Sequence, residues 1–378
     1  MTRRAILTWL FLLATLQWHC IQSYVSPYHS PANGYLVVEG YITGNGPTSF
    51  RLTRSIALPG DSTIPAVTGA HVQVEGSDNT VYPFTETGNG FYVLPGISMN
   101  AAVRYRLRIS NVNQEEYLSD YVPFKPTPAL DSTVWALDTA GVNIYTYTHD
   151  PTGNTRYYQW KYNETWELTS WERSISVYQG DTLALRTPAQ QIYTCWHTDS
   201  SSAILLGTSE QLAQDVINRK PIVVIPWNTE QLGIEYSVQV SQYALTDSGY
   251  NYLTLMKSNS EQLGSVMDPL PSQLTGNIHC LSHPGEMVIG FISAGTLQQQ
   301  RIFIQRSQVP GWLYYFACPF PDITVAPDDY YLYFVRLYYT PIGPEALGSN
   351  DGAWANYNDC IDCRARDGAS NQQPAFWQ

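Results

Sequence analysis

Hydrophobic and polar residues alternate along several short stretches of the chain, most clearly at residues 103–109. Valine, tyrosine, leucine and isoleucine occupy every second position there, and three arginines lie between them. Because successive side chains of a β-strand point to opposite faces, this pattern predicts a strand with one buried face and one solvated face. Residues 70–75 alternate in the same way, and residues 36–42 form a further apolar stretch. The pattern predicts several short strands.

Turn-forming residues separate these strands at short intervals. Clusters of Gly, Pro, Asn and Asp occur at residues 59–61, 76–79 and 88–90. Short strands with a turn about every ten residues are typical of immunoglobulin-like sandwiches, so we predict one over residues 34–122. Three prolines within residues 123–128 interrupt helices and strand ladders, and this segment is therefore predicted to be a linker.

The remaining residues, 129–378, are predicted to form a larger β-rich sandwich domain with one or two short helices and a cysteine-containing tail. A turn at residues 150–154 is predicted to join two strands into a hairpin with an aromatic face. Short helices are predicted at residues 209–218 and after Thr246, which suits an N-cap. The aromatic run at residues 330–339 predicts a late strand. The predicted fold class is all-β.

Residues 1–20 have the character of an export signal. Two arginines give a positive start, and the mostly apolar residues 5–16 are too few to cross a bilayer as a helix. Cys20 follows, which predicts a lipoprotein whose acyl chains anchor it to a membrane. Ordinary secretory cleavage is the alternative, because His19 stands where a small residue is preferred. Residues 21–33 are predicted to form a polar tether.

Composition and charge narrow the possible functions. Only 14% of the residues are charged, and the net charge is −12. Nucleic acid is therefore excluded as a partner, because phosphate binding needs a basic surface. The sequence contains no Gly-x-Ser-x-Gly elbow, no His-Glu-x-x-His motif and no phosphate-binding glycine loop, so we predict neither an enzyme nor a cofactor. An enzyme with paired carboxylates stays an alternative, because their spacing exists only in three dimensions.

Five cysteines follow Cys20, and in an exported protein they are candidates for disulfides. They are Cys195, Cys280, Cys318, Cys360 and Cys363. Because five is odd, at least one thiol is free or pairs outside the chain, and the sequence does not assign the pairs. Metal binding by thiolates and nearby histidines, such as His279 and His283, is the alternative; oxidation removes thiolates, and no metal site is predicted. Cys360 and Cys363 are interpreted as structural rather than redox-active.

Two tryptophans, Trp171 and Trp196, are candidates for stacking against a ligand. Sugar rings stack on exposed aromatic faces, whereas a buried core is the commoner place for aromatic residues on one face of a hairpin. We assign Trp160 to the core for that reason. The other two keep a glycan-binding adhesin or surface-layer component open as an alternative function.

Several short segments resemble, in the same order, those of a known family. They are residues 36–40, 51–55, 158–160, 164–167, 242–245, 276–280, 288–290, 360–364 and 374–377. The family is a group of Bacteroidetes lipoproteins known as domain of unknown function 4249. The joint order of the segments is much more specific than any one of them.

The resemblance implies an outer-membrane protein that is lipidated at Cys20. Because members are commonly encoded beside TonB-dependent outer-membrane receptors, it also implies an accessory role at such a transporter. It implies no catalytic residues. Residues 21–24 lack the acidic residues that usually follow the lipidated cysteine in surface-exposed lipoproteins of this phylum. The leaflet therefore stays open, with the cell surface favoured over the periplasmic face.

Overall fold

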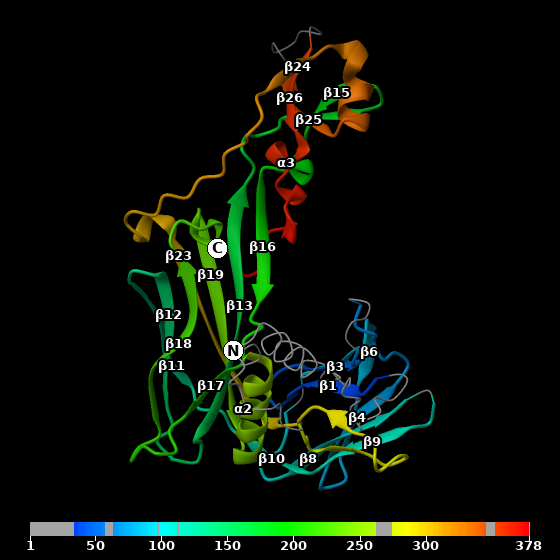
Figure 1. Ribbon diagram of the computed structural model, residues 1–378, viewed down its shortest axis with the longest axis vertical. Helices are drawn as coiled ribbons and strands as arrows, with labels where there is room; N and C mark the ends of the chain where they lie inside the picture. Colours follow the sequence, from blue (N-terminus) through cyan, green and yellow to red (C-terminus); the bar gives the residue numbers. More distant parts are fainter. Residues whose placement is uncertain are drawn as a thin grey trace, which may run out of the picture.

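The computed structural model describes residues 34–56, 63–96, 98–111, 113–261, 274–344 and 352–377. The predicted signal peptide, Cys20 and the tether lie outside these residues. No helix within the described ranges is long and apolar enough to span a membrane. The chain forms two β-sandwiches and a smaller tip. Figure 1 shows the N-terminal sandwich beside one end of the second sandwich and the tip at the opposite end.

Two sheets pack face to face to form the N-terminal sandwich. Its strands are β1 (Leu36–Gly40), β2 (Ile42–Thr43), β3 (Thr48–Arg54), β4 (His71–Gly76), β5 (Val81–Pro83), β6 (Thr85–Gly88), β7 (Phe91–Leu94), β8 (Arg104–Ser110), β9 (Glu116–Ser119), β10 (Val122–Lys125), β20 (Ile278–Cys280), β21 (Val288–Ile289) and β22 (Ala294–Gly295). One sheet has the order β21-β1-β3-β7-β6 and the other β2-β22-β10-β8-β4-β5, while β9 pairs with both β8 and β20. The immunoglobulin-like sandwich predicted for this part of the chain is confirmed.

Strand β8 shows how the alternating pattern produces this sandwich. Its tyrosine, leucine and isoleucine are buried in the core between the two sheets. On the outer face Arg106 and Arg108 make ion pairs with Glu75 of β4, at 2.7 and 2.6 Å. The predicted strand and its two faces are confirmed, and these two arginines neutralise a neighbouring carboxylate.

Residues 278–295 complete the N-terminal sandwich, although the sequence assigned them to the second domain. Strand β21 runs parallel to β1, and β22 runs parallel to both β2 and β10. Ile278 and Ile292 belong to the same core as Leu36 and Phe50. The predicted boundaries therefore need correction. Pairing between segments so far apart in the chain leaves no local signal of the kind that turns provide.

The predicted linker at residues 123–128 is a fixed joint. Phe124 of β10 is buried in the N-terminal core. The Thr127 hydroxyl accepts a hydrogen bond from the Ala244 amide at 3.0 Å, and the Thr127 amide donates to the Thr296 hydroxyl at 2.7 Å. The two sandwiches are thus joined where the chain first leaves the N-terminal sandwich, near Thr127, and where it leaves that sandwich a second time, near Thr296.

The second sandwich is larger and also has two sheets. Its strands are β11 (Leu130–Leu137), β12 (Gly141–His149), β13 (Tyr157–Thr169), β16 (Thr194–Ser200), β17 (Leu205–Thr208), β18 (Val216–Pro226), β19 (Glu235–Leu245), β23 (Leu297–Gln305) and β27 (Ala369–Ser370). One sheet has the order β11-β12-β18, and the other has the order β23-β19-β13-β16-β27 with β17 also on β13. Trp160 is fully buried between them, as predicted.

The predicted hairpin around residues 150–154 is not formed, because β12 and β13 belong to opposite sheets. The Asp150 carboxylate accepts hydrogen bonds from the backbone amides of Thr152 and Thr155, at 2.9 Å each. Asp side chains stabilise turns in this way. Here the turn carries the chain from one sheet to the other, so the two aromatic-rich strands face each other across the core.

The tip contains two small sheets and short helical turns. Its elements are β14 (Ser176–Gln179), β15 (Thr182–Leu185), β24 (Ile323–Val325), β25 (Tyr339–Pro344), β26 (Ala353–Tyr357), α3 (Asn358–Ile361), η4 (Pro327–Asp329) and η5 (Leu332–Arg336). The strand predicted over residues 330–339 is wrong in its first part, which is helical. Pro327 at the first position and two aspartates in the first turn favour a helix start there.

Of the two helices predicted from the sequence, one is present and the other is not. Helix α2 (Asp247–Glu261) is confirmed, and its cap is the Thr246 hydroxyl, which accepts a hydrogen bond from the Gly249 amide at 3.1 Å. The helix predicted at residues 209–218 is wrong, because Val216 already begins β18 and pairs with β12. Single helical turns complete the list: η1 (Pro188–Gln190), η2 (Glu230–Leu232), η3 (Arg306–Gln308) and η6 (Cys363–Ala365).

Candidate functional site

Two disulfides fix the C-terminal segment, and one of them bonds it to β16 of the second sandwich. Cys195 bonds to Cys363, with 5.8 Å between their Cα atoms, and Cys318 bonds to Cys360, with 5.4 Å. Cys280 is a buried thiol. The structural role predicted for Cys360 and Cys363 is confirmed, but they bond to separate partners rather than to each other. These bonds remove three of the thiolates that the metal alternative needed, those of Cys195, Cys360 and Cys363.

Both disulfides flank one hollow at the end of the second sandwich, which we call the aromatic pocket. The Trp171 amide donates a hydrogen bond to the Cys360 carbonyl at 2.8 Å, and the Cys363 amide donates to the Ile192 carbonyl at 2.9 Å. Each bond therefore fixes a wall that contributes lining residues. The pocket has a volume of about 230 Å³ and is lined by Glu167–Trp171, Tyr193, Glu230, Gly233, Ile234, Arg306, Tyr314–Phe316 and Arg366.

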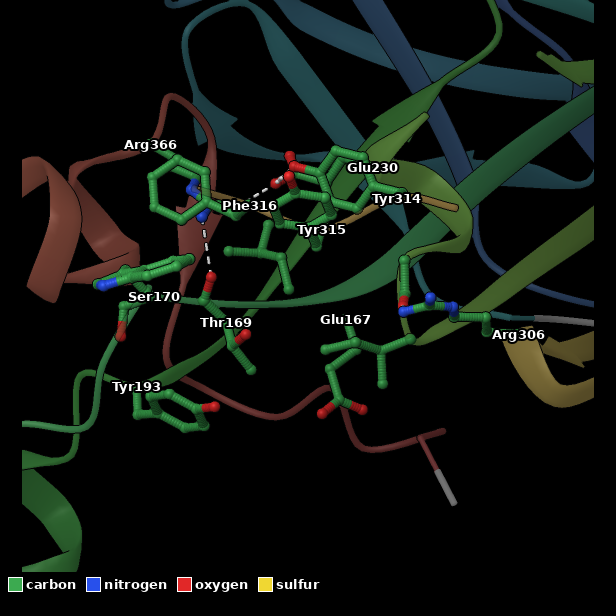
Figure 2. Close-up of a pocket in the computed structure, with 14 residues that line it drawn as sticks. Glu167, Thr169, Ser170, Tyr193, Glu230, Arg306, Tyr314, Tyr315, Phe316 and Arg366 are labelled. Atoms are coloured by element: carbon green, nitrogen blue, oxygen red, sulfur yellow. Dashed lines mark hydrogen bonds and ion pairs between the residues drawn. The ribbon is translucent and has the colours of Figure 1, made fainter. Parts of the chain in front are cut away.

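One side of the aromatic pocket is a closed polar network. The Arg366 guanidinium pairs with the Glu230 carboxylate and donates to the Thr169 carbonyl at 2.8 Å (Figure 2). It also lies over the Phe316 ring, 3.9 Å from the ring centroid, and the Tyr314 hydroxyl donates to Glu230 at 3.0 Å. The ion pair between Arg366 and Glu230 thus holds this wall together and neutralises both charges.

The other side of the aromatic pocket offers groups that can meet a ligand. Figure 2 shows the Glu167 carboxylate and the Tyr193 hydroxyl on the side away from Arg366. Burial raises the pKa of Glu167 above its ordinary value, and the nearby Glu235 charge adds to that shift. Trp171 is 46% exposed and Tyr315 is 75% exposed. Two accessible rings beside a carboxylate can stack on a flat ligand and accept hydrogen bonds from it.

The predicted stacking residues separate. Trp171 lines the aromatic pocket, whereas Trp196 lies on β16 and its ring packs edge-on against Trp377, with centroids 6.4 Å apart. Trp196 therefore belongs to the packing of the C-terminal tail. The sequence missed Tyr193 and Tyr315. Tyr193 reaches the pocket through the pairing of β13 with β16, and Tyr315 comes from a segment distant in sequence.

A larger hollow lies between the two sandwiches, and we call it the inter-unit cavity. Its volume is about 770 Å³, and its lining comes from β1, the chain around Phe291, β13, β19 and α2. Tyr41 and Tyr243 meet edge to face with their centroids 4.9 Å apart, and the Tyr41 hydroxyl donates to the Ala244 carbonyl at 3.2 Å. Tyr252 of α2 packs on Phe291 at 5.4 Å. Four aromatic side chains therefore contribute to the cavity wall.

Lys161 supplies the cationic group of the inter-unit cavity. The cavity walls surround the side chain, yet solvent still reaches it. Burial lowers the pKa of Lys161, and the negative charge of Glu39 opposes that shift. The ammonium lies 6.0 Å from the centroid of the Tyr243 ring. A lysine in such a position can pair with an anionic group of a bound molecule.

Sequence reasoning missed this cavity. Lys161 alternates with the buried Trp160 along β13, so its outward orientation follows from the strand period. What covers that outward face is not a local property, because Tyr41 and Phe291 come from the N-terminal sandwich. The signal that was available is an isolated lysine between aromatic residues.

Comparison with known proteins identifies a family. The model of the family described as domain of unknown function (DUF4249) matches residues 23–301. This range contains every residue that lines the inter-unit cavity, whereas Arg306, Tyr314–Phe316 and Arg366 of the aromatic pocket lie beyond it. The chain matches no curated protein.

Two solved structures are also similar. A segment of two fibronectin type III domains from chicken tenascin is 9% identical, covers 55% of this chain and 90% of its own, and has a TM-score of 0.17. The BSP domain of a biofilm-associated protein is 8% identical, and the match covers 76% of this chain and 62% of that domain's chain, with a TM-score of 0.14. At these TM-scores neither similarity carries an argument, and the fold rests on the strand topology.

Proposed function

Because this chain belongs to the DUF4249 family, we propose that it is a non-catalytic outer-membrane lipoprotein that binds a small ligand for a TonB-dependent transporter. The inter-unit cavity is the observation that carries this proposal. Ligand sites have volumes of roughly 300–1,000 Å³ and favour junctions between domains, and this cavity has about 770 Å³ at such a junction. All its lining residues fall in the range that the family model matches.

The chemistry of the inter-unit cavity defines the class of ligand. Tyrosine and phenylalanine rings form apolar walls, and Lys161 provides one positive charge. The matching ligand is a small aromatic or amphipathic molecule with one anionic group. The fixed joints near Thr127 and Thr296 favour binding because the walls are already in place before the ligand arrives.

An aromatic sulfonate tests this ligand class. We expect 1-anilinonaphthalene-8-sulfonate to bind the purified protein with increased fluorescence. Lys161→Met should weaken that binding by about tenfold, the loss expected when a charge-assisted contact is removed. Arg104→Met removes a positive charge outside the cavity and should leave the affinity unchanged. Equal affinity of the wild type and Lys161→Met would rule the cavity out as the anion site.

The transporter partner is tested in the native envelope. The tagged protein should recover a β-barrel receptor from detergent-solubilised outer membranes. We expect Cys20→Ser to abolish incorporation of labelled palmitate and to release the protein from the membrane, because acyl chains supply the anchor. Recovery of the acylated protein with no β-barrel partner would reject the transporter role, and palmitate incorporation by Cys20→Ser would reject the anchor. Protease treatment of whole cells then distinguishes the cell surface from the periplasmic face.

A glycan-binding role is the second candidate, and the aromatic pocket favours it. Trp171 and Tyr315 expose their rings beside the Glu167 carboxylate. We expect Trp171→Ala to abolish retention on immobilised polysaccharide. Trp354→Ala is the matched control, because Trp354 is 42% exposed and lies on β26 of the tip. Equal retention of the two variants would count against a stacking site.

A further inference from the structure

Cys280 differs from the other cysteines in the described part of the chain. Four of these form two disulfides, whereas Cys280 is a thiol with only 3% of its surface exposed. It ends β20 and packs into the core of the N-terminal sandwich. Thiols of exported proteins usually form disulfides. A buried thiol that stays reduced beside other polar groups is therefore a candidate for a role other than packing.

Two consecutive turns bring an imidazole and a carboxylate to this thiol. The His283 amide donates a hydrogen bond to the Cys280 sulfur at 3.3 Å, and the Glu286 amide donates to the His283 carbonyl at 2.8 Å. Pro284 follows His283 and restricts the second turn, which is a favoured place for proline. One ligand atom from each of Cys280, His283 and Glu286 lies within 4.8 Å of the others.

A second layer of groups orients the carboxylate. The Tyr117 hydroxyl donates a hydrogen bond to Glu286 at 3.0 Å, and Arg54 makes ion pairs with both Glu286 and Glu115 at 3.3 Å. Metal-binding carboxylates are commonly held by outer-shell hydrogen bonds of this kind.

We propose that Cys280, His283 and Glu286 form a site for a borderline divalent cation, for which Zn²⁺ is the best match. Thiolate sulfur, imidazole nitrogen and carboxylate oxygen are all zinc ligands, and three protein ligands leave a fourth position for water. The charges also fit. A thiolate, two glutamates and one arginine carry two net negative charges, which a divalent cation neutralises. This inference is independent of the ligand proposed for the inter-unit cavity.

The site also connects parts of the chain that are distant in sequence. Its ligands belong to the 278–295 segment, whereas Arg54 and Tyr117 belong to β3 and β9 of the N-terminal sandwich. A bound cation would therefore stabilise the docking of this segment. Binding to the folded state alone raises stability with metal concentration.

Cobalt titration of the purified protein, with both disulfides intact, tests the site. We expect one equivalent of Co²⁺ to give a thiolate-to-cobalt charge-transfer band, and Zn²⁺ to displace it and raise the melting temperature. His283→Asn and Glu286→Gln should each weaken binding by at least about tenfold, a loss that outer-shell changes alone can produce. Cys280→Ser should remove the band.

His279→Asn is the matched control. His279 is a neighbouring exposed histidine that lies 3.2 Å from Asp120 and is outside the ligand set. We expect it to bind Co²⁺ with the affinity of the wild type. Absence of the charge-transfer band in the wild type, or equal losses in His279→Asn and His283→Asn, would overturn the proposal. His283 is exposed, so its substitution tests the site even where Cys280→Ser fails to fold.

Discussion

The aromatic pocket and the inter-unit cavity are both built from distant parts of the chain, but by different means. Two covalent bonds fasten the walls of the aromatic pocket. The pairing of β22 with β2 and β10, together with hydrogen bonds around Thr127 and Thr296, holds the walls of the inter-unit cavity. Chemical reduction should therefore affect the first site much more than the second, so the two ligand hypotheses can be separated without touching either lining.

Removing a disulfide should have the largest effect. Cys195 and Cys363 are 168 residues apart, so their bond strongly restricts the unfolded chain, and we expect Cys195→Ser with Cys363→Ser to cost about 4 kcal/mol. The pair Cys318 and Cys360, 42 residues apart, should cost slightly less. Denaturant unfolding measures both. Loss of sulfonate binding in either variant under native conditions would show that the two hollows are not independent.

Breaking the joint between the sandwiches should come next. A Cβ atom at Gly295 would lie 2.0 Å from the Lys125 carbonyl oxygen, so a side chain there separates β22 from β10. We expect Gly295→Val to cost about 3 kcal/mol, the upper end for overpacking. It should also weaken sulfonate binding while leaving polysaccharide retention intact. Gly46→Ala is the control, because its Cβ atom would meet only the Thr43 side chain, at an ordinary van der Waals distance of 3.7 Å. A folded Gly295→Val protein with unchanged sulfonate affinity would contradict the role of the joint.

A smaller effect should appear in the pH dependence. Burial raises the pKa of Glu167 above 4.5, so the folded protein holds this proton more tightly than the unfolded chain. The stability that this provides is complete below the unfolded pKa and is lost as the pH rises through the folded pKa. We therefore expect Glu167→Gln to gain stability relative to the wild type as the pH rises from about 4 to about 7, measured by thermal unfolding.

Glu75 is the control of opposite sign for that experiment. Burial acts to raise its pKa, but hydrogen bonds from Arg108 and Arg106 hold the pKa of Glu75 below 4.5. Its stabilisation is present above the unfolded pKa and is lost as the pH falls through the folded pKa. Glu75→Gln should therefore lose stability relative to the wild type at neutral pH. The same sign for both variants would contradict the assigned environments.

The smallest effect on stability should come from Trp171→Ala. Because the ring is 46% exposed and forms part of a pocket wall, we expect a change within about 0.5 kcal/mol. Polysaccharide retention should be lost all the same. A loss of several kcal/mol would identify Trp171 as a core residue and remove the case for stacking.

The sequence predicted elements whose causes are local. The alternation in β8 and the Thr246 cap of α2 each depend on a few neighbouring residues, and both were found. The return of residues 278–295 to the N-terminal sandwich and the crossover between β12 and β13 depend on pairing partners far along the chain. Alternation alone does not select those partners. The strand prediction in the tip was wrong for a different reason. The aromatic run at residues 330–336 suits a strand, but it follows a helix start at Pro327.

The candidate sites show the same division. Trp171 was singled out by its residue type and lines the aromatic pocket, and the odd number of cysteines after Cys20 agrees with the buried thiol of Cys280 in the described part of the chain. The bond between Cys360 and Cys318 was not predictable. Cys363 lies much closer to Cys360 in the sequence, and no sequence feature shows how the chain between Cys318 and Cys360 folds. Lys161 was missed because the aromatic residues around it come from two sandwiches.

The return of residues 278–295 has a consequence for folding. Domains generally fold as units in the order in which they are synthesised. Here the first sandwich lacks β20, β21 and β22 until most of the second has also emerged. During that interval the flanks of β1 and β10 are unpaired, and open strand edges attract other chains. A fragment that ends near residue 128 therefore does not form a finished sandwich.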